Sequence, residues 1–214
     1  MRFSITRTAG IAAAVTTLAG CGLTTAADAK MHTTSAPTAV TRPVAVPALT
    51  PAQVRYEHKS WGDPKTEVGV IVWTPANWRM VKLSTFEAEF ISPNALWNLR
   101  INGSFTPGKK PVKSAVDAKI AALKATKGLR IISRVDGTTK ATSPYSGGLT
   151  FHHTTLTYSY TDGARGSRLV VDRFVAAFQA TGTDFEISAG GRPQDKAGLD
   201  AITAKATQDY ARLP

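Results

Sequence analysis

Cysteine is almost missing from this sequence: Cys21 is the single one among 214 residues. A lone thiol can form no internal disulfide, and it leaves no CxxC motif for redox chemistry or zinc binding. Familiar enzyme motifs are missing as well, since the sequence has no GxSxG, SxxK, HExxH or GxGxxG pattern and no P-loop. A disulfide scaffold is therefore excluded. Catalysis is less expected but not excluded, because catalytic groups are brought together by the fold.

Acidic residues are scarce relative to basic ones: 15 Asp and Glu stand against 26 Lys and Arg, a formal net charge of +11. Such an excess favours contact with anionic partners and says little about the fold. With 43% hydrophobic residues the chain can bury a core, which excludes global disorder, and 17 Gly and 12 Pro without a G-X-Y period exclude collagen. At this length we expect one folded domain with extensions.

The N-terminus carries the strongest signal in the sequence. Arg2 and Arg7 form a basic region, and an apolar stretch of roughly ten residues follows from Ala9 to Leu18. This stretch is too short to cross a bilayer about 30 Å thick. Residues 1–20 are therefore predicted to be a secretory signal peptide, and the absence of a twin-arginine motif favours general secretion.

The signal segment runs into Leu18-Ala19-Gly20-Cys21, which resembles the lipobox of bacterial lipoproteins. This resemblance implies cleavage before Cys21 and attachment of a diacylglyceryl group, with acyl chains such as palmitate, to its thiol. Two acyl chains at about 0.8 kcal/mol per buried CH₂ anchor a protein stably. We expect Cys21 to be lipidated and the protein to lie on the extracytoplasmic face of the cell membrane. The alternative is an unpaired cysteine behind an ordinary signal peptide.

Residues 21–53 are predicted to form the lipidated Cys and a flexible tether. From Gly22 onward this segment has no aromatic residue, is rich in Ala and Thr, and has prolines spaced through its second half. It cannot bury enough apolar surface to fold, and its prolines favour extended conformations at about 3.1 Å per residue. A single domain is expected over residues 54–214.

Hydrophobic patterns of period two predict that most of this domain is β-structure. The expected strands cover residues 68–73, 79–83, 86–91, 96–101, 129–135, 149–160, 167–178 and 184–188, with a polar loop over 138–148. Asp162 to Gly166 is the clearest hairpin signal, and Ser92-Pro93-Asn94 marks the turn of another hairpin.

Two segments switch to a helical period. The first predicts a helix over 114–127 and the second a helix over 196–212. Their apolar stripes consist of Val112, Val116, Ile120 and Leu123 in the first and of Leu199, Ile202, Ala206 and Tyr210 in the second. Many antiparallel strands with these helices predict an α+β domain, with an antiparallel sheet of six or more strands flanked by helices.

The sequence resembles the PsbP-like α/β/α sandwich in four features. These are the order of the elements, the turn Pro75-Ala76-Asn77-Trp78, the acidic-aromatic strand ending in Ser92-Pro93 and the strand ending near Asn102. With a lipobox in front, the chain most resembles the actinobacterial cell-envelope lipoproteins of the LpqN type, over about Arg55 to Leu213. The resemblance implies an extracytoplasmic, non-catalytic domain of poorly defined ligand. No catalytic, metal or cofactor residue carries over from it, and none is predicted.

Several residues invite a chemical interpretation. His152 and His153 are adjacent, but neighbours on a strand point to opposite faces, so the two rings cannot readily share a metal. We expect one ring at the surface and the other packed or hydrogen-bonded, with a catalytic role for either as the alternative. The polar loop Tyr145–Gly148 is a candidate because such loops often carry function, whereas Asn102-Gly103-Ser104 is interpreted as a turn.

Four tryptophans are candidates for stacking on a sugar or a base. Trp73 and Trp97 lie inside apolar strands, and we expect both in the core. Trp61 and Trp78 stand beside Gly62 and Asn77, so they are expected at a partly exposed rim where a ligand can be contacted.

Positive charge is concentrated between residues 109 and 134, where the basic residues face only Asp117. On the predicted helix, three of the lysines fall beside the apolar stripe, so their ammonium groups are expected to reach water. Two interpretations stay open, a solvated rim and salt-sensitive docking on an anionic envelope component; nucleic acid is not an expected partner. The residues of this predicted surface are Lys109, Lys110, Lys113, Lys119, Lys124 and Lys127, followed by Arg130 and Arg134.

The lipobox and the lack of a catalytic motif together favour a membrane-anchored, extracytoplasmic lipoprotein that acts as a non-catalytic binding or accessory module of the cell envelope. The alternatives are a hydrolase or transferase acting on envelope lipids or polymers, and a solute-capturing accessory to a transporter. A closed, featureless sandwich would favour the first function, and a deep polar pocket would favour either alternative.

Overall fold

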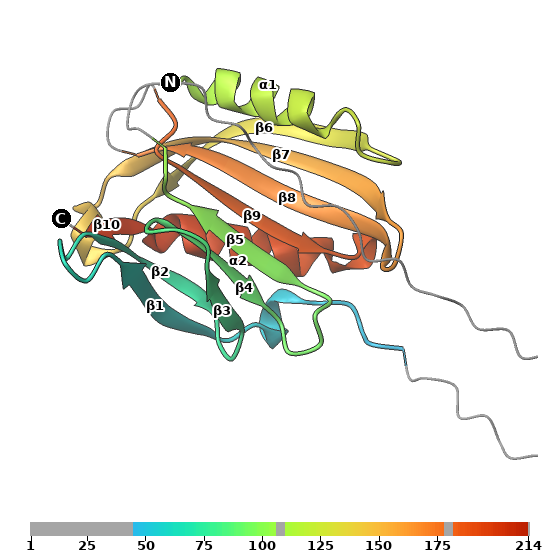
Figure 1. Ribbon diagram of the computed structural model, residues 1–214, viewed down its shortest axis with the longest axis horizontal. Coiled ribbons are helices and arrows are strands. Elements are labelled where there is room, and N and C mark those ends of the chain that lie inside the picture. Colours follow the sequence, from blue (N-terminus) through green and yellow to red (C-terminus); the bar gives the residue numbers. More distant parts are fainter. Residues whose placement is uncertain (1–44, 106–109, 178–181, 214) are drawn as a thin grey trace, which may run out of the picture. The chain divides into compact units, whose positions relative to one another are not determined.

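The computed structural model describes residues 45–105, 110–177 and 182–213. The predicted signal peptide, Cys21 and Lys109 lie outside these residues. Within them the fold is α+β, as predicted, with a seven-stranded antiparallel sheet, a three-stranded antiparallel sheet and two α-helices (Figure 1). In chain order the elements are β1 (Tyr56–Gly62), β2 (Gly69–Pro75), β3 (Arg79–Lys82), β4 (Glu87–Ile91), β5 (Asn98–Asn102), α1 (Val112–Leu123), β6 (Arg130–Lys140), β7 (Thr150–Asp162), β8 (Gly166–Ala176), β9 (Phe185–Gly191), α2 (Lys196–Asp209) and β10 (Ala211–Leu213).

The large sheet has the order β3-β4-β5-β9-β8-β7-β6, and the small sheet has the order β1-β2-β10. Both predicted hairpins are present: β4 pairs with β5, and β7 pairs with β8 around the turn that ends at Gly166. Gly166 has a φ of +72°, a left-handed conformation that glycine adopts without steric cost. These two long strands lie between the central strand β9 and the edge strand β6.

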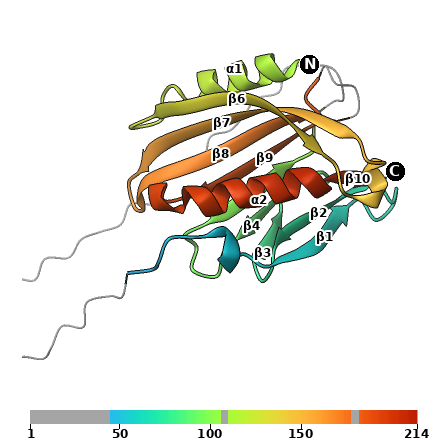
Figure 2. The same ribbon diagram turned by 180° about the vertical axis from the view of Figure 1, so that it is seen from behind.

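The two faces of the large sheet carry different layers. Along β8, alternate residues such as Val171 and Val175 join the main core, while Val170 and Phe174 join a second, smaller core. Because neighbours on a strand point to opposite faces, the two cores lie on opposite sides of the sheet. The main core also contains residues of α2 and of the small sheet, whereas the second core contains residues of α1. Figure 2 shows α2 in front of the face that is turned away in Figure 1.

Helix α2 confirms the predicted apolar stripe, since Leu199, Ile202, Ala206 and Tyr210 are all buried in the main core. The predicted end of the helix at Arg212 is wrong. The chain leaves the helix at Tyr210, whose buried ring stacks on Phe185 with 3.7 Å between ring centroids. The next residues become extended and pair with β2 as β10, because that edge of β2 still offers backbone hydrogen bonds.

Helix α1 is shorter than the predicted helix over 114–127 and ends at Leu123. Its predicted stripe packs on the sheet as expected: Val116 is fully buried, and Ile120 and Leu123 are partly buried against the second core. The rest of the predicted helix forms turns up to Gly128, which has a φ of +67°.

Two strands differ from the sequence prediction. Strand β1 was not predicted, because its sequence YEHKSWG has mixed polarity, yet it pairs with β2 along its whole length. Strand β6 continues to Lys140 and so takes the first residues of the predicted loop over 138–148. Both are edge strands, for which partner pairing rather than hydrophobic pattern decides the conformation.

The packed unit begins at Ala45 rather than at Val54. Leu49 is buried against α2, where a Cβ at Gly198 would lie only 2.5 Å from Leu49 Cγ. The Leu49 amide donates to Asp195 Oδ1 at 2.9 Å, and Arg192 donates to the carbonyls of Val46 and Pro47. Burial alone would raise the pKa of Asp195, but the hydrogen bonds that its carboxylate accepts from Arg192 and from the Leu49 amide lower it to about 2. The last part of the predicted tether is therefore fixed to the domain.

Candidate functional site

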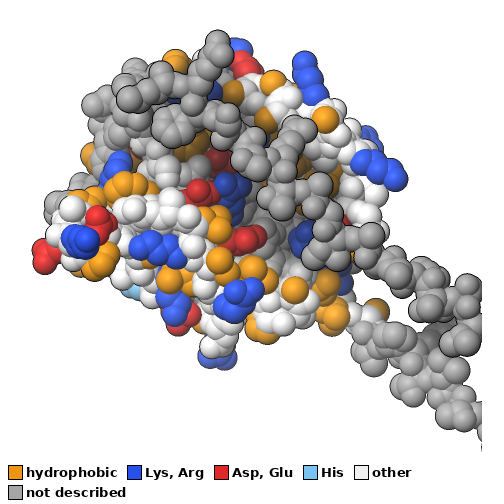
Figure 3. Space-filling model, viewed as in Figure 1, with side chains coloured by type: hydrophobic (Ala, Val, Ile, Leu, Met, Phe, Trp, Pro, Cys, Tyr) orange, Lys and Arg blue, Asp and Glu red, His pale blue; other side chains and the backbone are white. Residues whose placement is uncertain are grey.

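Helix α1 covers only part of its face of the large sheet, and a cleft lies over the part that it leaves open. The cleft consists of two adjoining hollows of about 390 Å³ and about 280 Å³, which share Glu89, Asn98 and Tyr160. Lys119 from α1 and Tyr158 from β7 line the larger hollow. We call the two hollows together the sheet-face cleft. Figure 3 shows acidic and basic side chains meeting near the centre of this face.

Strand register places the charged residues on this face. Glu89 on β4 is the cross-strand partner of Arg100 on β5, Arg100 is the partner of Ser188 on β9, and Ser188 is the partner of Asp172 on β8. Cross-strand partners point to the same face of a sheet. The floor of the cleft is thus a polar row that crosses strands whose other face is apolar.

A buried ionic cluster closes one end of the cleft. Lys119 Nζ lies 3.1 Å from Asp172 Oδ2 and 2.6 Å from Glu186 Oε1. Asp172 is 0% exposed, and the Lys119 side chain is 23% exposed. Among the described residues, Lys119 is the ion-pair partner of Asp172. The cluster holds one ammonium group between two carboxyl groups.

Burial shifts the protonation equilibria of this cluster. It raises the pKa of Asp172, and the charge of Glu186 raises it further, against the opposing effect of Lys119. Burial by itself would lower the pKa of Lys119, but the charges of Asp172 and Glu186 outweigh it and raise that pKa. The pKa of the Tyr158 hydroxyl is raised by burial and by the charge of Asp172. Perturbed groups of this kind, gathered in a cleft, are typical of functional sites.

The other end of the cleft is basic. Arg79 from the start of β3, Arg165 from the β7–β8 turn and Arg168 from β8 line the smaller hollow, which we call the arginine hollow. Arg168 is 2% exposed, and its Nη1 donates to the Leu96 carbonyl at 2.7 Å. Between the two ends, Asn98 Nδ2 donates to Glu89 Oε1 at 2.9 Å. The cleft therefore offers donors and acceptors at both ends for a polar ligand.

Sequence reasoning missed this site. The signal was present, because Glu87, Glu89 and Arg100 alternate with apolar residues on two predicted strands, and Asp172 interrupts an apolar strand. Such alternation is also typical of a strand that faces water, so it did not by itself indicate a cleft.

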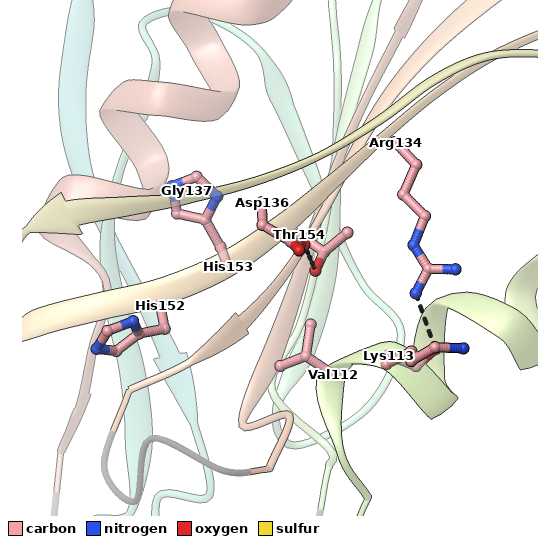
Figure 4. Close-up of a pocket in the computed structure, with 8 residues that line it drawn as sticks. All are labelled: Val112, Lys113, Arg134, Asp136, Gly137, His152, His153 and Thr154. Carbon is pink, nitrogen blue, oxygen red and sulfur yellow. Dashed lines mark hydrogen bonds between the residues drawn. The ribbon is translucent and has the colours of Figure 1, made fainter.

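The histidine pair lies beside a third hollow of about 450 Å³, near the start of α1 (Figure 4). As predicted, His152 is exposed while His153 packs against Gly137, and its Nε2 lies 3.1 Å from Thr139 Oγ1. Burial, and after it the charge of Arg173, lowers the pKa of His153 to about 4. Among the described residues, no three His, Cys, Asp or Glu side chains come together as metal ligands do.

The predicted lysine surface is only partly formed. Among its residues that the structure describes, Lys110, Lys113, Lys124 and Lys127 are exposed. The prediction that the ammonium group of Lys119 reaches water is wrong. This group turns into the buried cluster, because two carboxyl groups of the sheet lie beneath the helix.

Two other cations of the predicted lysine surface, Lys113 and Arg134, form ion pairs with the same carboxylate, that of Asp117. Lys113 Nζ lies 2.9 Å and Arg134 Nη1 2.7 Å from the carboxyl oxygens of Asp117. Arg134 Nη2 also donates to the Lys113 carbonyl at 3.3 Å. These contacts leave less unpaired charge around the start of α1 than the sequence indicates.

The tryptophan prediction is wrong in the opposite sense for each pair. Trp61 and Trp78 are buried in the main core, whereas Trp73 and Trp97 are half-buried. Trp73 alternates with Val70 and Val72 along β2, so it faces away from the core, where it stacks on His58 with 3.8 Å between ring centroids. Apolar neighbours in sequence do not tell which face of a strand is buried.

The other candidate segments are structural. Ser146 is buried, and its hydroxyl donates to the Tyr210 carbonyl at 3.0 Å, so the Tyr145–Gly148 loop fixes the end of α2. Asn102 Oδ1 accepts from the Ser104 amide at 2.9 Å, the arrangement of an Asx turn. No helix among the described residues has the length and apolar character needed to cross a membrane.

No protein-family model matches the sequence, and no curated protein matches it either. Among solved structures, the chain is similar to the crystal structure of LpqN, described as involved in cell envelope biogenesis of Mycobacterium tuberculosis. The TM-score is 0.42 and the identity 19%, over 79% of this chain and 100% of that chain. A likeness at this level assigns neither a ligand nor an activity to this chain.

Proposed function

We propose that the protein is a membrane-anchored, extracytoplasmic lipoprotein whose domain binds a small polar ligand in the sheet-face cleft, as an accessory module of the cell envelope. The location rests on the sequence, where the single cysteine follows an apolar signal segment at Leu18-Ala19-Gly20. The binding function rests on one observation, the polar floor of the cleft with the fully buried Asp172 at its end. Burying a carboxyl group in a domain of this size is costly, and a ligand site is a reason to retain it.

The cleft favours ligand capture over a featureless scaffold. Its lining is rich in charged groups and phenols, and the described residues that line it include no histidine. A solute-capturing accessory to a transporter is therefore the second candidate. A hydrolase or transferase receives less support, because Ser188 lies opposite a carboxyl group without an imidazole between them.

Lipidation is tested at Cys21. Mass spectrometry of membrane-extracted protein should find a diacylglyceryl group on Cys21, and the Cys21→Ala variant should leave the membrane fraction. Thr24→Ala, changed just beyond the lipobox, serves as the control and should stay in the membrane. Membrane retention of Cys21→Ala would contradict the anchor.

Ligand capture is tested by filling the cleft. Native mass spectrometry of detergent-extracted protein should show a non-covalent adduct on the wild type. Ser188→Trp, which fills the floor of the larger hollow, should lose the adduct, and Ser167→Trp, on an exposed part of β8, should keep it. Equal adducts in both variants would show that the cleft is not the binding site.

A further inference from the structure

The arginine hollow contains a buried guanidinium that has no ion-pair partner among the described residues. Arg168 is 2% exposed, its Nη1 is bonded to a neutral carbonyl, and its Nε has no hydrogen-bond partner among the described residues. Within those residues Arg168 forms no ion pair. A buried charge without an opposite charge is strongly destabilising, and proteins retain one where it serves a purpose.

Cations outnumber anions in the lining of the hollow, where Arg79, Arg165 and Arg168 stand against Glu89. Arg79 is exposed at the start of β3 and forms no ion pair among the described residues, and Arg165 bonds to Asp162 through its Nε at 2.7 Å. Burial and the positive charge of Arg165 lower the pKa of Arg168, while Tyr160 and the charge of Asp162 act in the opposite direction. Guanidinium groups from three places in the fold thus surround one hollow.

The backbone makes room for this arrangement. A Cβ at Gly190 would lie 2.4 Å from Asn98 Oδ1 and 3.8 Å from Arg168 Nη2. A side chain at this position would therefore clash with Asn98, whereas Arg168 lies at ordinary van der Waals distance. The guanidinium is held in place by the fold rather than left on a flexible surface.

The same hollow also has acceptors for hydroxyl groups. Glu89 is the single carboxylate of its lining, and Asn98 and Tyr160 lie beside it. Asn98 Nδ2 donates to Oε1 of Glu89, and the carboxylate has further lone pairs for O–H donors. Guanidinium groups match the geometry of phosphate oxygens, whereas a carboxylate repels a bare phosphate.

We infer that the arginine hollow binds a phosphate ester of a polyol, with the phosphate on Arg79, Arg165 and Arg168 and the hydroxyl groups on Glu89 and Asn98. A hollow of about 280 Å³ accommodates a group of the size of glycerol phosphate. This inference rests on the proposed ligand-binding function and names the ligand class. The same chemistry occurs in free glycerol phosphate and in the headgroup of phosphatidylglycerol.

The experiment uses the full chain carrying Cys21→Ala, so that no acyl anchor contributes to binding. Calorimetry measures binding of glycerol 3-phosphate and of inorganic phosphate, and cosedimentation measures binding to vesicles of phosphatidylglycerol and of phosphatidylcholine. Saturable binding of glycerol 3-phosphate or of phosphatidylglycerol vesicles supports the inference. Preference for one of these two probes identifies the free ester or the lipid headgroup as the source.

Variants distinguish the site from general charge attraction. Arg79→Met should weaken binding of the preferred probe about tenfold, since one charge-assisted contact is lost. Arg55→Met removes the same charge from an exposed position just before β1, outside both the hollow and the lysine surface, and should leave binding unchanged. Glu89→Gln should weaken binding of glycerol 3-phosphate without weakening that of inorganic phosphate.

Three results would overturn the inference: no saturable binding of either ester probe, equal weakening by Arg79→Met and Arg55→Met, or tighter binding of inorganic phosphate than of glycerol 3-phosphate by the wild type. If this test fails, two results that support the proposed function still stand: the lipid on Cys21, and the adduct that the wild type carries and Ser188→Trp loses. If instead Cys21 carried no lipid and Ser188→Trp kept the adduct, the proposed function itself would be refuted.

Discussion

The two faces of the large sheet are built from the same strands and yet have opposite character. On one face, α2 and the small sheet cover a continuous apolar core that includes Phe90, Leu99, Ile187 and Ile202, all fully buried. On the other face, α1 covers a small core and leaves Glu89, Arg100 and Ser188 in an open cleft, beside the buried Asp172. One face is closed by packing, and the other is left open around charged groups.

This difference separates stability from function. A face closed by apolar packing gains free energy in proportion to the area it buries, while a buried ionic cluster contributes little net stability. The α2 face is therefore expected to hold the fold together, and the α1 face to hold a ligand. The following changes test this division.

The largest effect is expected at the buried cluster. Lys119→Met should lower the free energy of unfolding by about 3–5 kcal/mol near neutral pH, because it leaves the carboxyl groups of Asp172 and Glu186 without the cation between them. Chemical denaturation measures the loss. Lys113→Met removes an ammonium group from an exposed pair on the same helix and should have a much smaller effect. Equal losses of stability in the two variants would show that the buried cluster is no more sensitive to losing its cation than the exposed pair.

A matched pair of isoleucines compares the two helices directly. Ile202→Ala in α2 should cost about 2–5 kcal/mol, because Ile202 is fully buried. Ile120→Ala in α1 should cost about 1 kcal/mol, because its side chain is only partly buried. Unfolding in urea with a constant m-value gives both numbers. If Ile120→Ala proved the more costly, the α1 face would be the main core and the comparison would be reversed.

The contact between Leu49 and α2 predicts a smaller loss. In Gly198→Ala the new Cβ would meet Leu49, and overpacking of about 1–3 kcal/mol should outweigh the gain of about 1 kcal/mol in helix propensity. Thermal unfolding should show a lower Tm, partly restored in the double variant Gly198→Ala/Leu49→Ala. Gly163→Ala, where a Cβ meets nothing within 4 Å, is the control. A Tm raised by Gly198→Ala would mean that residues 45–53 are not held against the helix.

The smallest effect is a change in pH dependence. Because the pKa of Asp172 is raised in the folded state, its contribution to stability is fully present below its ordinary value of 3.8 and is lost as pH rises toward neutrality. Asp172→Asn lacks this contribution, so its stability should fall less than that of the wild type between about pH 4 and pH 7. His153 titrates in part of this range with the opposite sign but is the same in both proteins. Parallel stability curves would show that Asp172 is not perturbed.

The sequence was sufficient for the elements whose pattern reflects burial. Period-two alternation predicted β4, β5, β7 and β8, and the stripe from Leu199 to Ala206 predicted α2, because a half-buried strand or helix must repeat its apolar residues with its own period. It failed at β1, β10 and the four tryptophans. There the outcome depends on which edge is free and which face is covered, and neither is encoded locally.

The sequence by itself determined the candidate lipobox at Cys21, the α+β class and the apolar stripes of both helices, because each of these depends on neighbouring residues. Only the tertiary structure brought Lys119, Asp172 and Glu186 together, and only it gathered Arg79, Arg165 and Arg168 around one hollow. These groups come from separate strands, a turn and a helix. Their meeting depends on antiparallel register and on where α1 packs on the sheet, which no local pattern specifies.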